Sequence, residues 1–311
     1  MIELDPAFRQ RMIDVFSDDG RSWLARLPDI LDEYTRRWEI TLEPPFPLSY
    51  NYVAPATRAD GTRAVFKCGV ERGPVGCEIA ALQHWDGDGA VRVLEADMPA
   101  GVFLLERLSP GREIIAIDDA DATRIAARLM RRLWRPAPAE HSFPALTDWG
   151  DAFRLLRERH GGGTADLPAK AVDRGEALYF DLVASQAERI VLHGDLHHWN
   201  ILSAEREPWL IIDPHGVLGE PAFEVGAWLR NPVGEPEEPY EERFLLNQPD
   251  PRSVLDRRLH IFAEELAIDR QRLRDWGIAF ATLSACWSDE SSHRAGWEQA
   301  LAVAELLAGL G

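Results

Sequence analysis

Apolar residues recur with a helical period over the first 38 residues of the chain. Spacings of three and four residues place such side chains on one face of a helix. The Pro44–Pro47 segment then interrupts the pattern, because proline cannot continue a helix. The sequence therefore predicts two weakly amphipathic helices before this segment. Their apolar positions are Phe8, Met12, Val15 and Phe16, then Trp23, Leu24, Leu27, Leu31 and Tyr34.

The next segment of the chain consists of short, extended-type runs with one helical run among them. Asp60-Gly61 lies between the first two runs and is typical of a hairpin turn. Glu78–Trp85 carries Ile79, Leu82 and Trp85 at helical spacing. This order predicts an antiparallel sheet with one inserted helix. The predicted strands are 50–53, 63–68, 91–94 and 102–106.

Helical periods dominate after a break at Ser109–Arg112. Three helices are predicted, and acidic residues or a serine before the first two are suitable N-terminal caps. Together the patterns predict an α+β fold with a small sheet-containing lobe, residues 1–107, and a larger helical lobe, residues 108–311. The helices are marked by Ile125, Leu129 and Leu133 after Asp118, Asp119 and Asp121; by Leu255, Leu259, Phe262 and Leu266 after Ser253; and by Trp297, Leu301, Ala304 and Ala308. A loop is predicted at His160–Thr164 and a surface segment at Pro232–Pro239.

Composition narrows the classes of function. The formal net charge of -18 argues against nucleic-acid binding, which uses basic patches, and is compatible with a cationic small molecule. No apolar run approaches the roughly 20 residues needed to span a bilayer, and the first residues lack the features of a signal peptide. Three cysteines, Cys68, Cys77 and Cys286, suit neither a disulfide framework nor a zinc site. We expect a cytoplasmic monomer or homodimer.

The segments His193–Asn200 and Trp209–Gly216 carry the chemistry. Each follows or includes an apolar, β-branched run, and together they supply Asp195, Asn200 and Asp213 in the pattern H-x-D-x-x-x-x-N followed by an aspartate. Phosphoryl transfer needs a carboxylate that accepts the hydroxyl proton and oxygen ligands for Mg²⁺. The spacing predicts Asp195 as the catalytic base and Asn200 and Asp213 as Mg²⁺ ligands. We expect His193 to hold the loop through backbone hydrogen bonds.

The smaller lobe offers residues for ATP. Lys67 ends an apolar strand, where it can pair with phosphates while a carboxylate from the following helix holds it; Glu78 is the better candidate and Glu71 the weaker. Backbone groups at Glu106–Leu108 are candidates for binding the adenine edge, at Glu106 and Leu108 in particular. The segment Pro47–Tyr52 replaces a glycine-rich loop, so Ser49 or backbone amides must cover the phosphates. This absence argues against a protein kinase.

The acceptor is predicted to lie against the loops after Asp213. Carboxylates and aromatic faces are the groups that hold polycationic or polyhydroxyl molecules. Trp228 and Trp276 stand in apolar surroundings and are predicted to be core. The candidate substrate residues are His215, Glu224, Trp287, Asp289 and Glu290, with Glu220, Glu235, Glu237 and Glu238 as further acidic candidates.

Three alternatives to a resistance kinase remain open at this stage. A metabolic kinase of a sugar, amino sugar or amino alcohol fits the same motifs. A nucleotide-binding pseudokinase would lack Asp195, Asn200 or Asp213, and all three are present. A metal-dependent hydrolase would use the imidazoles as Zn²⁺ ligands but leaves Lys67 and Asn200 unexplained. Its candidate ligands are His193, Asp195, His197, His198 and His215.

The chain resembles the aminoglycoside phosphotransferase superfamily, and within it the streptomycin 6-kinase and hydroxyurea kinase group. The resemblance rests on Asp60-Gly61 with Val65–Lys67, the helix from Glu78, 85–94, Leu104–Gly111, the His193–Asn200 loop, 208–216, 219–225, 229–232 and 283–287.

The resemblance implies a protein-kinase-like fold of two lobes and ATP-dependent O-phosphorylation of a small molecule, with streptomycin or hydroxyurea as an antibiotic substrate. It also implies Asp195 as base, Asn200 and Asp213 as Mg²⁺ ligands and Lys67 as the phosphate-binding lysine. Two residues depart from the pattern of the group: His215 replaces a lysine, and Glu224 stands where an aspartate is common.

Overall fold

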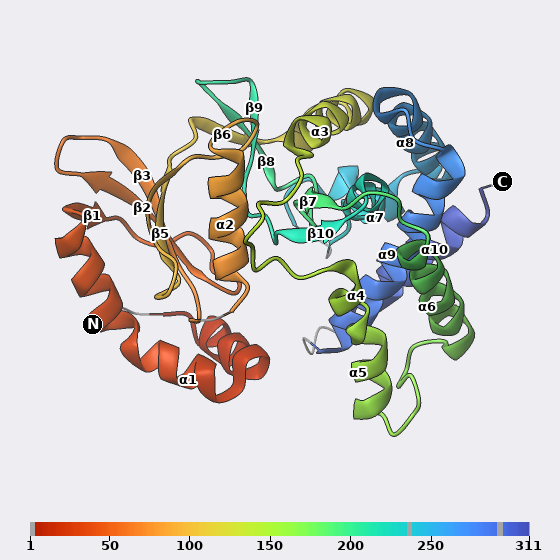
Figure 1. The fold of residues 1–311 in the computed structure, drawn as a ribbon, viewed down its shortest axis with the longest axis horizontal. Helices are drawn as coiled ribbons and strands as arrows, with labels where there is room; N and C mark the ends of the chain where they lie inside the picture. Colours follow the sequence, from red (N-terminus) through yellow and green to blue (C-terminus); the bar gives the residue numbers. More distant parts are fainter. Residues whose placement is uncertain (1–3, 72, 235–237, 291–294, 311) are drawn as a thin grey trace. The chain divides into compact units, whose positions relative to one another are not determined.

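The computed structural model describes residues 4–71, 73–234, 238–290 and 295–310 of the 311-residue chain. The chain divides into two compact units, Met1–Gly111 and Arg112–Gly311. The first unit is an antiparallel sheet with two helices, and the second is mainly helical (Figure 1). The assignment of nucleotide binding to residues 1–107 and acceptor binding to residues 108–311 stays a prediction.

The first unit contains a five-stranded sheet in the order β1-β2-β3-β5-β4. The predicted hairpin is confirmed: β2 and β3 pair antiparallel, and Gly61 in the connecting turn has a φ of +86°, which favours glycine. The strand predicted at 50–53 begins two residues later and is longer, and the three-residue β1 is too short to show a period. The strands are β1 (Ile40–Leu42), β2 (Tyr52–Arg58), β3 (Arg63–Cys68), β4 (Val93–Asp97) and β5 (Val102–Glu106).

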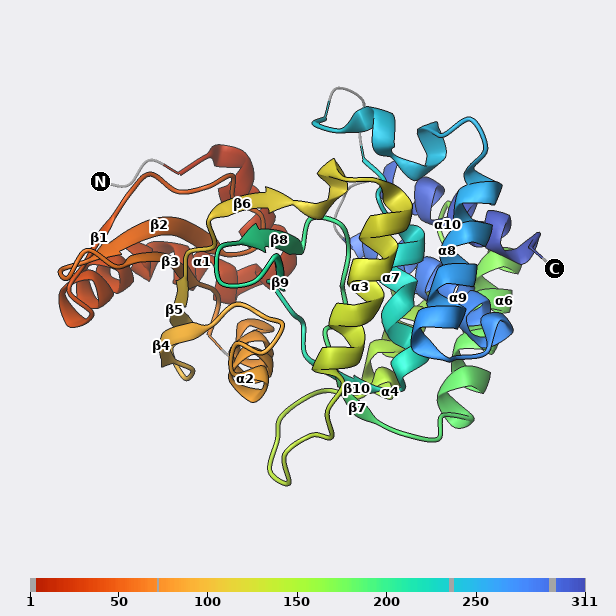
Figure 2. The same ribbon diagram turned by 90° about the horizontal axis from the view of Figure 1, so that it is seen from above.

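Two helices cover the two faces of this sheet (Figures 1 and 2). Helix α1 (Pro6–Arg37) packs on the face that presents Phe66 and Cys68. It bends at Ser17, whose φ of 51° is non-helical, so the prediction of two helical stretches is confirmed. Because side chains alternate along a strand, Lys67 points to the opposite face, where α2 (Val75–Trp85) lies.

The second unit is built around helix α9, which packs against α5, α6, α7, α8 and α10. Buried aromatic side chains form much of this core, among them Trp228 and Trp276, as predicted. Two small sheets pair β7 with β10, and β8 with both β6 and β9. The helices are α3 (Asp119–Leu133), α4 (Leu146–Trp149), α5 (Asp151–Arg159), α6 (Ala169–Ala184), α7 (Val225–Arg230), α8 (Pro251–Leu266), α9 (Arg270–Glu290) and α10 (Ala295–Ala308). The strands are β6 (Pro110–Glu113), β7 (Ile190–Leu192), β8 (Ile201–Ala204), β9 (Trp209–Ile211) and β10 (Val217–Gly219), and the 3₁₀ turns are η1 (Ile114–Ala116), η2 (Pro221–Glu224), η3 (Glu241–Arg243) and η4 (Leu245–Asn247).

Helix boundaries follow local capping more closely than apolar period. Asp118 caps α3 as predicted, accepting hydrogen bonds from the N–H groups of Ala120 and Asp121. Helix α8 begins before Ser253, because Asp250 is its cap and Pro251 occupies the first helical position. The predicted break at Ser109–Arg112 contains most of β6.

Helix α9 was not predicted, because side chains around most of its circumference are buried and it therefore shows no amphipathic period. Part of Pro232–Pro239, including Glu235 and Glu237, lies outside the described residues.

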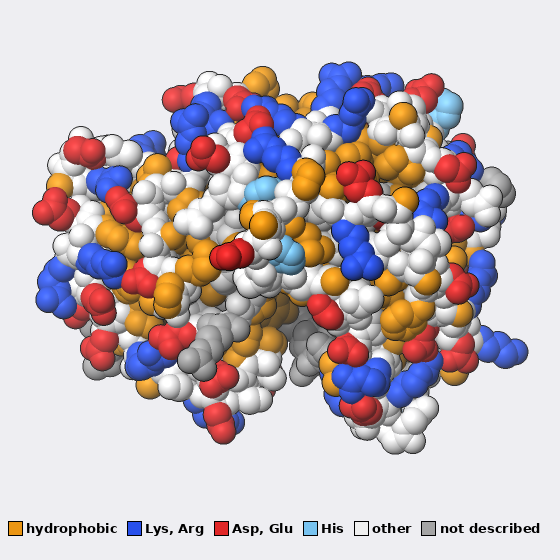
Figure 3. Space-filling view, viewed as in Figure 1, with side chains coloured by type: hydrophobic (Ala, Val, Ile, Leu, Met, Phe, Trp, Pro, Cys, Tyr) orange, Lys and Arg blue, Asp and Glu red, His pale blue; other side chains and the backbone are white. Residues whose placement is uncertain are grey.

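The surface is mixed in charge. Acidic and basic side chains are interspersed on the face of each unit that Figure 3 shows. No helix in the described ranges combines the length and the apolar character that a bilayer crossing requires.

The packing of α6 on α9 gives a stability prediction. A Cβ added at Gly175 of α6 would lie 2.4 Å from side-chain atoms of the buried Thr282 of α9. We expect Gly175→Ala to lower the free energy of unfolding by about 1–3 kcal/mol, as overpacking typically does. The matched variant Gly76→Ala, in α2 where a Cβ meets nothing within 4 Å, should be neutral or raise stability by about 0.5–1 kcal/mol. Urea unfolding followed by circular dichroism measures both, and equal midpoints for the two variants would contradict the packing argument.

Candidate active site

Lys67 and Glu78 form a buried ion pair in the first unit. Lys67 ends the apolar part of β3 and Glu78 lies in the first turn of α2, and each residue is 5% exposed. The Nζ atom of Lys67 lies 2.8 Å from each oxygen of the Glu78 carboxylate. The predicted pairing is confirmed, and Glu71 is instead paired with Arg26 at 2.8 Å. The pair fixes an ammonium group on one face of the sheet.

The other residues predicted to contact the nucleotide lie in two segments of the same unit. Ser49 is exposed in the loop between β1 and β2, where Arg11 donates to the carbonyls of Leu48 and Ser49. Glu106 ends β5, and its carboxylate accepts a hydrogen bond from the Arg92 N–H. Within the described ranges, the backbone N–H and C=O of Leu108 make no hydrogen bond. Of these backbone groups, those of Leu108 remain available to a ligand.

The loop after β7 is held by the imidazole of His193. Its Nδ1 accepts a hydrogen bond from the Asp195 N–H at 3.2 Å, and its Nε2 donates to the carbonyl of Ile212 at 2.9 Å. Burial lowers the pKa of His193 to about 4, so the ring is neutral at pH 7 and can play both parts. The predicted backbone role of His193 is confirmed.

Asp195 projects from this loop between two histidines. Its Oδ2 lies 3.4 Å from Nε2 of His197 and 3.9 Å from Nε2 of His215. Burial alone would raise the pKa of Asp195, but His197, His215 and Arg230 together lower it below its ordinary value. A carboxylate that is ionised at pH 7 can accept a proton from a nearby hydroxyl group.

Asn200 and Asp213 are brought to the same end of the β8–β9 hairpin. The Ile212 N–H donates to the Asn200 carbonyl at 3.0 Å, so Asp213 follows directly beside Asn200. Asn200 is 6% exposed, and its Nδ2 donates to the Asp195 carbonyl at 3.0 Å. The Oδ1 atom of Asn200 takes no part in this contact, and no described residue donates a hydrogen bond to it. Asp213 has a φ of 62°, which is uncommon outside glycine, and its side chain is exposed.

Glu224 was predicted to contact the acceptor, but the structure buries it beneath the loop that carries Asp195. It is 1% exposed, and its two carboxylate oxygens accept hydrogen bonds from the N–H groups of His193 at 2.8 Å and Gly194 at 2.9 Å. Glu220 is likewise buried and is paired with Arg272 and the indole N–H of Trp276. Both carboxylates are used within the fold, so neither forms an exposed acidic wall.

Aromatic rings lie next to Asp195 in the second unit. The His215 ring meets the Trp149 ring edge-on at a centroid distance of 5.7 Å, and Trp149 meets Trp287 at 5.3 Å. All three side chains reach solvent. His215 and Trp287 were predicted, and the structure joins them through Trp149. Asp289 and Glu290 end α9, but their side chains lie outside the described residues, and Glu238 is exposed in the loop before η3.

Sequence reasoning missed Trp149 and Arg230. Trp149 belongs to the four-residue helix α4, which is too short for any period. Arg230 ends α7, close enough to lower the pKa of Asp195, and its Nε is buried without a hydrogen-bond partner among the described residues. In the sequence, Arg230 is marked only as a single basic residue at the end of an apolar run.

The burial of Glu224 gives a pH-dependence prediction. Burial raises its pKa to about 7 from an ordinary 4.5, against the two backbone hydrogen bonds that lower it. The folded chain therefore keeps a proton that the unfolded chain releases near pH 4.5. The contribution of this group to stability is complete below that pH and is lost as the pH rises through 7, by roughly 3 kcal/mol in all.

We expect the free energy of unfolding of the wild type, relative to that of Glu224→Gln, to fall by this amount between pH 5 and pH 8. Urea unfolding at intermediate pH values measures it. The control Glu264→Gln, at an exposed glutamate of α8, should run parallel to the wild type. If the free energies of unfolding of the wild type and of Glu224→Gln changed in parallel with pH, burial would not govern the titration of Glu224.

Comparison with known proteins agrees with this arrangement. The chain is 31% identical to streptomycin 6-kinase of Streptomyces glaucescens over 99% of its length and 98% of that protein. It is 32% identical to hydroxyurea phosphotransferase of Kitasatospora aureofaciens, covering 93% of this chain and 81% of that one. Choline kinase LicA from Streptococcus pneumoniae is similar in fold, with a TM-score of 0.62 at 13% identity over 90% of this chain and 98% of that chain.

A family model places these likenesses in one group. The model described as aminoglycoside/hydroxyurea antibiotic resistance kinase matches residues 43–292. The match confirms the resemblance seen in the motifs and, with the solved structure, the protein-kinase-like fold, and it removes the metal-hydrolase alternative. The chain belongs to the aminoglycoside/hydroxyurea antibiotic resistance kinase family, whose members are ATP-using kinases of small molecules.

Proposed function

We propose that this protein transfers the γ-phosphoryl group of ATP, with Mg²⁺, to a hydroxyl group of a cationic antibiotic of the streptomycin type. The observation that carries the proposal is the environment of Asp195, an ionised carboxylate beside an exposed group of aromatic rings. Family membership supports the reaction, and the residues below support the roles within it.

Lys67 is the proposed ligand of the ATP phosphates. Its ammonium group is compact and already oriented by Glu78, so binding costs little further ordering of the side chain. The Leu108 backbone, whose N–H and C=O find no partner in the described ranges, is the proposed contact of the adenine edge. Ser49 is proposed to act from the exposed β1–β2 loop, in place of a glycine-rich loop.

Asn200 and Asp213 are the proposed Mg²⁺ ligands. Mg²⁺ prefers hard oxygen ligands, and both residues offer them at one end of the β8–β9 hairpin. The amide of Asn200 fits this role. Its nitrogen donates to the Asp195 carbonyl, and no described residue donates a hydrogen bond to its oxygen. When bound there, Mg²⁺ would neutralise charge on the phosphate oxygens.

Asp195 is the proposed general base. Its lowered pKa keeps it ionised at pH 7, ready to take the proton of the acceptor hydroxyl. Glu224 and His193 hold the backbone N–H groups of residues 193–195, so the carboxylate is oriented before the acceptor binds. Arg230, whose charge acts on Asp195, is a candidate to stabilise negative charge on the transferring group.

The aromatic group supports a cationic acceptor. Trp149 and Trp287 are both partly exposed and contact each other, and the indole is the best aromatic partner for a cation. Streptomycin is polycationic, whereas hydroxyurea is uncharged. The two tryptophans therefore favour streptomycin as the acceptor. A metabolic amino alcohol or amino sugar is also cationic and remains the alternative substrate.

Asp195→Asn tests the reaction. We expect phosphorylation to fall by at least about 10²-fold, because the base is lost, while ATP binding is retained. ADP release with Mg·ATP would be measured against streptomycin, other aminoglycosides, hydroxyurea, amino sugars and choline-like alcohols. The matched control is Asp181→Asn, an exposed aspartate of α6. Undiminished turnover in Asp195→Asn would overturn the assignment of the base, and silence of the wild type across the panel would overturn the proposed acceptor class.

Trp287→Ala tests whether the aromatic group of Trp149 and Trp287 binds a cationic acceptor. Loss of one cation–π face should raise the KM for a cationic acceptor by about two- to thirtyfold, because such contacts contribute about 0.5–2 kcal/mol. The KM for ATP should stay constant, and so should the KM for an uncharged acceptor. Equal increases for charged and uncharged acceptors would show that Trp287 contributes shape rather than cation recognition.

A further inference from the structure

The tip of the β1–β2 loop is tied to helix α1 by one arginine. The Nη1 atom of Arg11 lies 3.0 Å from the carbonyl oxygen of Leu48 and 3.4 Å from that of Ser49. Because Nη1 carries two hydrogens, each carbonyl can accept one of them. Within the described ranges, these are the only hydrogen bonds that residues 47–51 make.

Backbone pairing holds only the base of this loop. The N–H groups of Glu43 and Phe46 donate to carbonyls of β2, at 2.9 and 3.0 Å. The chain then bends repeatedly over 47–51 before β2 begins. The side chain of Leu48 packs against the apolar cluster that α1 shares with the sheet. Arg11 and the Leu48 side chain therefore fix the position of the tip.

The bend in α1 holds the backbone that carries Arg11. The halves of the helix on either side of the bend pack on each other, and the Phe8 and Trp23 rings meet at a centroid distance of 6.3 Å. Met12, the neighbour of Arg11, is fully buried. A Cβ at Gly20 would lie 2.2 Å from the Met12 carbonyl oxygen, so glycine permits this close approach. Arg11 therefore projects from a well-packed helix.

The contact with Arg11 determines where two backbone N–H groups point. These peptide bonds are trans, and a trans peptide holds its C=O and the N–H of the next residue on opposite sides. Since the carbonyls of Leu48 and Ser49 both face Arg11, the N–H groups of Ser49 and Tyr50 both face away from it. Neither N–H makes a hydrogen bond within the described ranges. Successive N–H groups on one side of a turn form a concavity that binds anions.

The charges around the tip also favour an anion. Segment 44–59 contains no acidic residue, although the chain as a whole has a formal net charge of -18. The guanidinium of Arg11 adds a positive charge directly behind the turn. A cationic ligand would meet N–H dipoles and this charge, whereas phosphate oxygens would be attracted by both.

We infer that Arg11 is a positioning residue for nucleotide binding. It holds the tip in the turn that directs the N–H groups of Ser49 and Tyr50 to phosphate oxygens of ATP. The inference rests on the proposed function and deepens it, because it names the donors that replace a glycine-rich loop and the residue that orients them. Helix α1 precedes the residues matched by the family model, 43–292, so this role is not part of the pattern common to the family.

Nucleotide affinity of the full chain, measured by calorimetry without an acceptor, tests the inference. Arg11→Met removes the donor and should weaken ATP and ADP by about fivefold or more, because hydrogen bonds from a charged donor are strong. Adenosine has no phosphate and should bind Arg11→Met as it binds the wild type. Arg11→Lys should recover most of the lost affinity, since an ammonium group also donates. The control Arg9→Met, at an exposed arginine of the same helix, should bind all three ligands as the wild type does.

A second measurement needs no variant of Arg11. The chain has five tyrosines, so labelling with ¹⁵N-tyrosine gives five backbone amide signals, and Tyr50→Phe identifies that of Tyr50. ADP should shift this signal saturably in the wild type, and adenosine should not.

Three results would overturn the inference. They are equal ADP affinity of the wild type and Arg11→Met, a Tyr50 amide signal that ADP leaves unchanged, and a parallel loss of ADP and adenosine affinity, which would mean a general structural role for Arg11. A wild type that binds no ATP would remove the proposed function together with this inference. A wild type that binds and uses ATP, with no effect of Arg11→Met, would remove this inference alone.

Discussion

The carboxylate of Glu224 is the constraint on which the candidate site depends. It is buried in the second unit and accepts hydrogen bonds from the two consecutive N–H groups before Asp195. The imidazole of His193 then ties the same turn to the Asp195 N–H and to the Ile212 carbonyl. Because Ile212 also pairs with Asn200, one set of hydrogen bonds positions all three residues of the proposed reaction. These hydrogen bonds fix the conformation of the loop.

Buried charges in both units are held in the same manner. Lys67 meets Glu78, Arg258 meets Asp119, and Glu220 meets Arg272. Removing charges from water is costly, and each charge is retained only because its partner and further hydrogen bonds compensate it. Arg258 also donates to the carbonyls of Trp228 and Asn231, so it joins α8 to the end of α7. Of the residues proposed to act in the reaction, Lys67 is oriented by such a pair.

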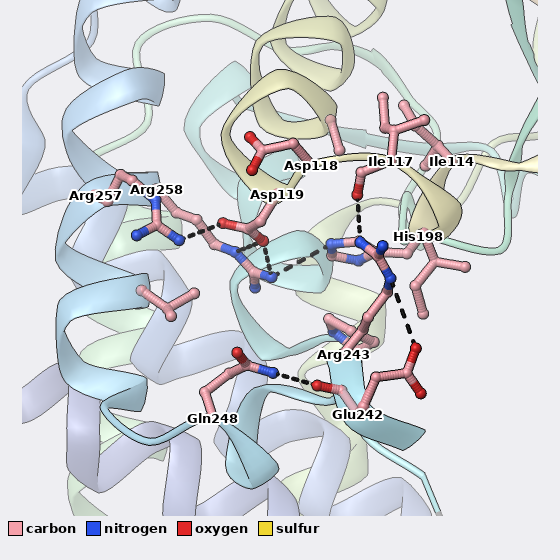
Figure 4. Close-up of a pocket in the computed structure, with 14 residues that line it drawn as sticks. Ile114, Ile117, Asp118, Asp119, His198, Glu242, Arg243, Gln248, Arg257 and Arg258 are labelled. Atoms are coloured by element: carbon pink, nitrogen blue, oxygen red, sulfur yellow. Dashed lines mark hydrogen bonds and ion pairs between the residues drawn. The ribbon is translucent and has the colours of Figure 1, made fainter. Parts of the chain in front are cut away.

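A few buried polar atoms of the described residues lack a hydrogen-bond partner, among them atoms of Trp23, Trp134, Gln186, Arg230 and His198. The Nε of Arg230 and the Nδ1 of His198 are buried atoms without hydrogen-bond partners among the described residues. Arg230 lies near Asp195, where a phosphoryl group is proposed to pass, and His198 lies at a separate cavity between the start of α3 and α8 (Figure 4). For Arg230, a phosphoryl group passing close to Asp195 would supply the missing partner.

The motifs of the sequence were enough to predict the class of reaction and the family. Asp195, Asn200 and Asp213 lie close together along the chain, and Lys67 and Glu78 are joined by a short connection, so spacing alone was enough to predict these groups and the Lys67–Glu78 pair. Tertiary structure decided what depends on distant residues. From the sequence, Glu224 was predicted to contact the substrate. In the structure it is buried and bonded to Gly194, which lies 30 residues earlier in the chain. Trp149, in a helix of one turn, meets His215 and Trp287 only through folding. A local pattern records the period of one element, whereas burial and long-range contact depend on which elements pack together.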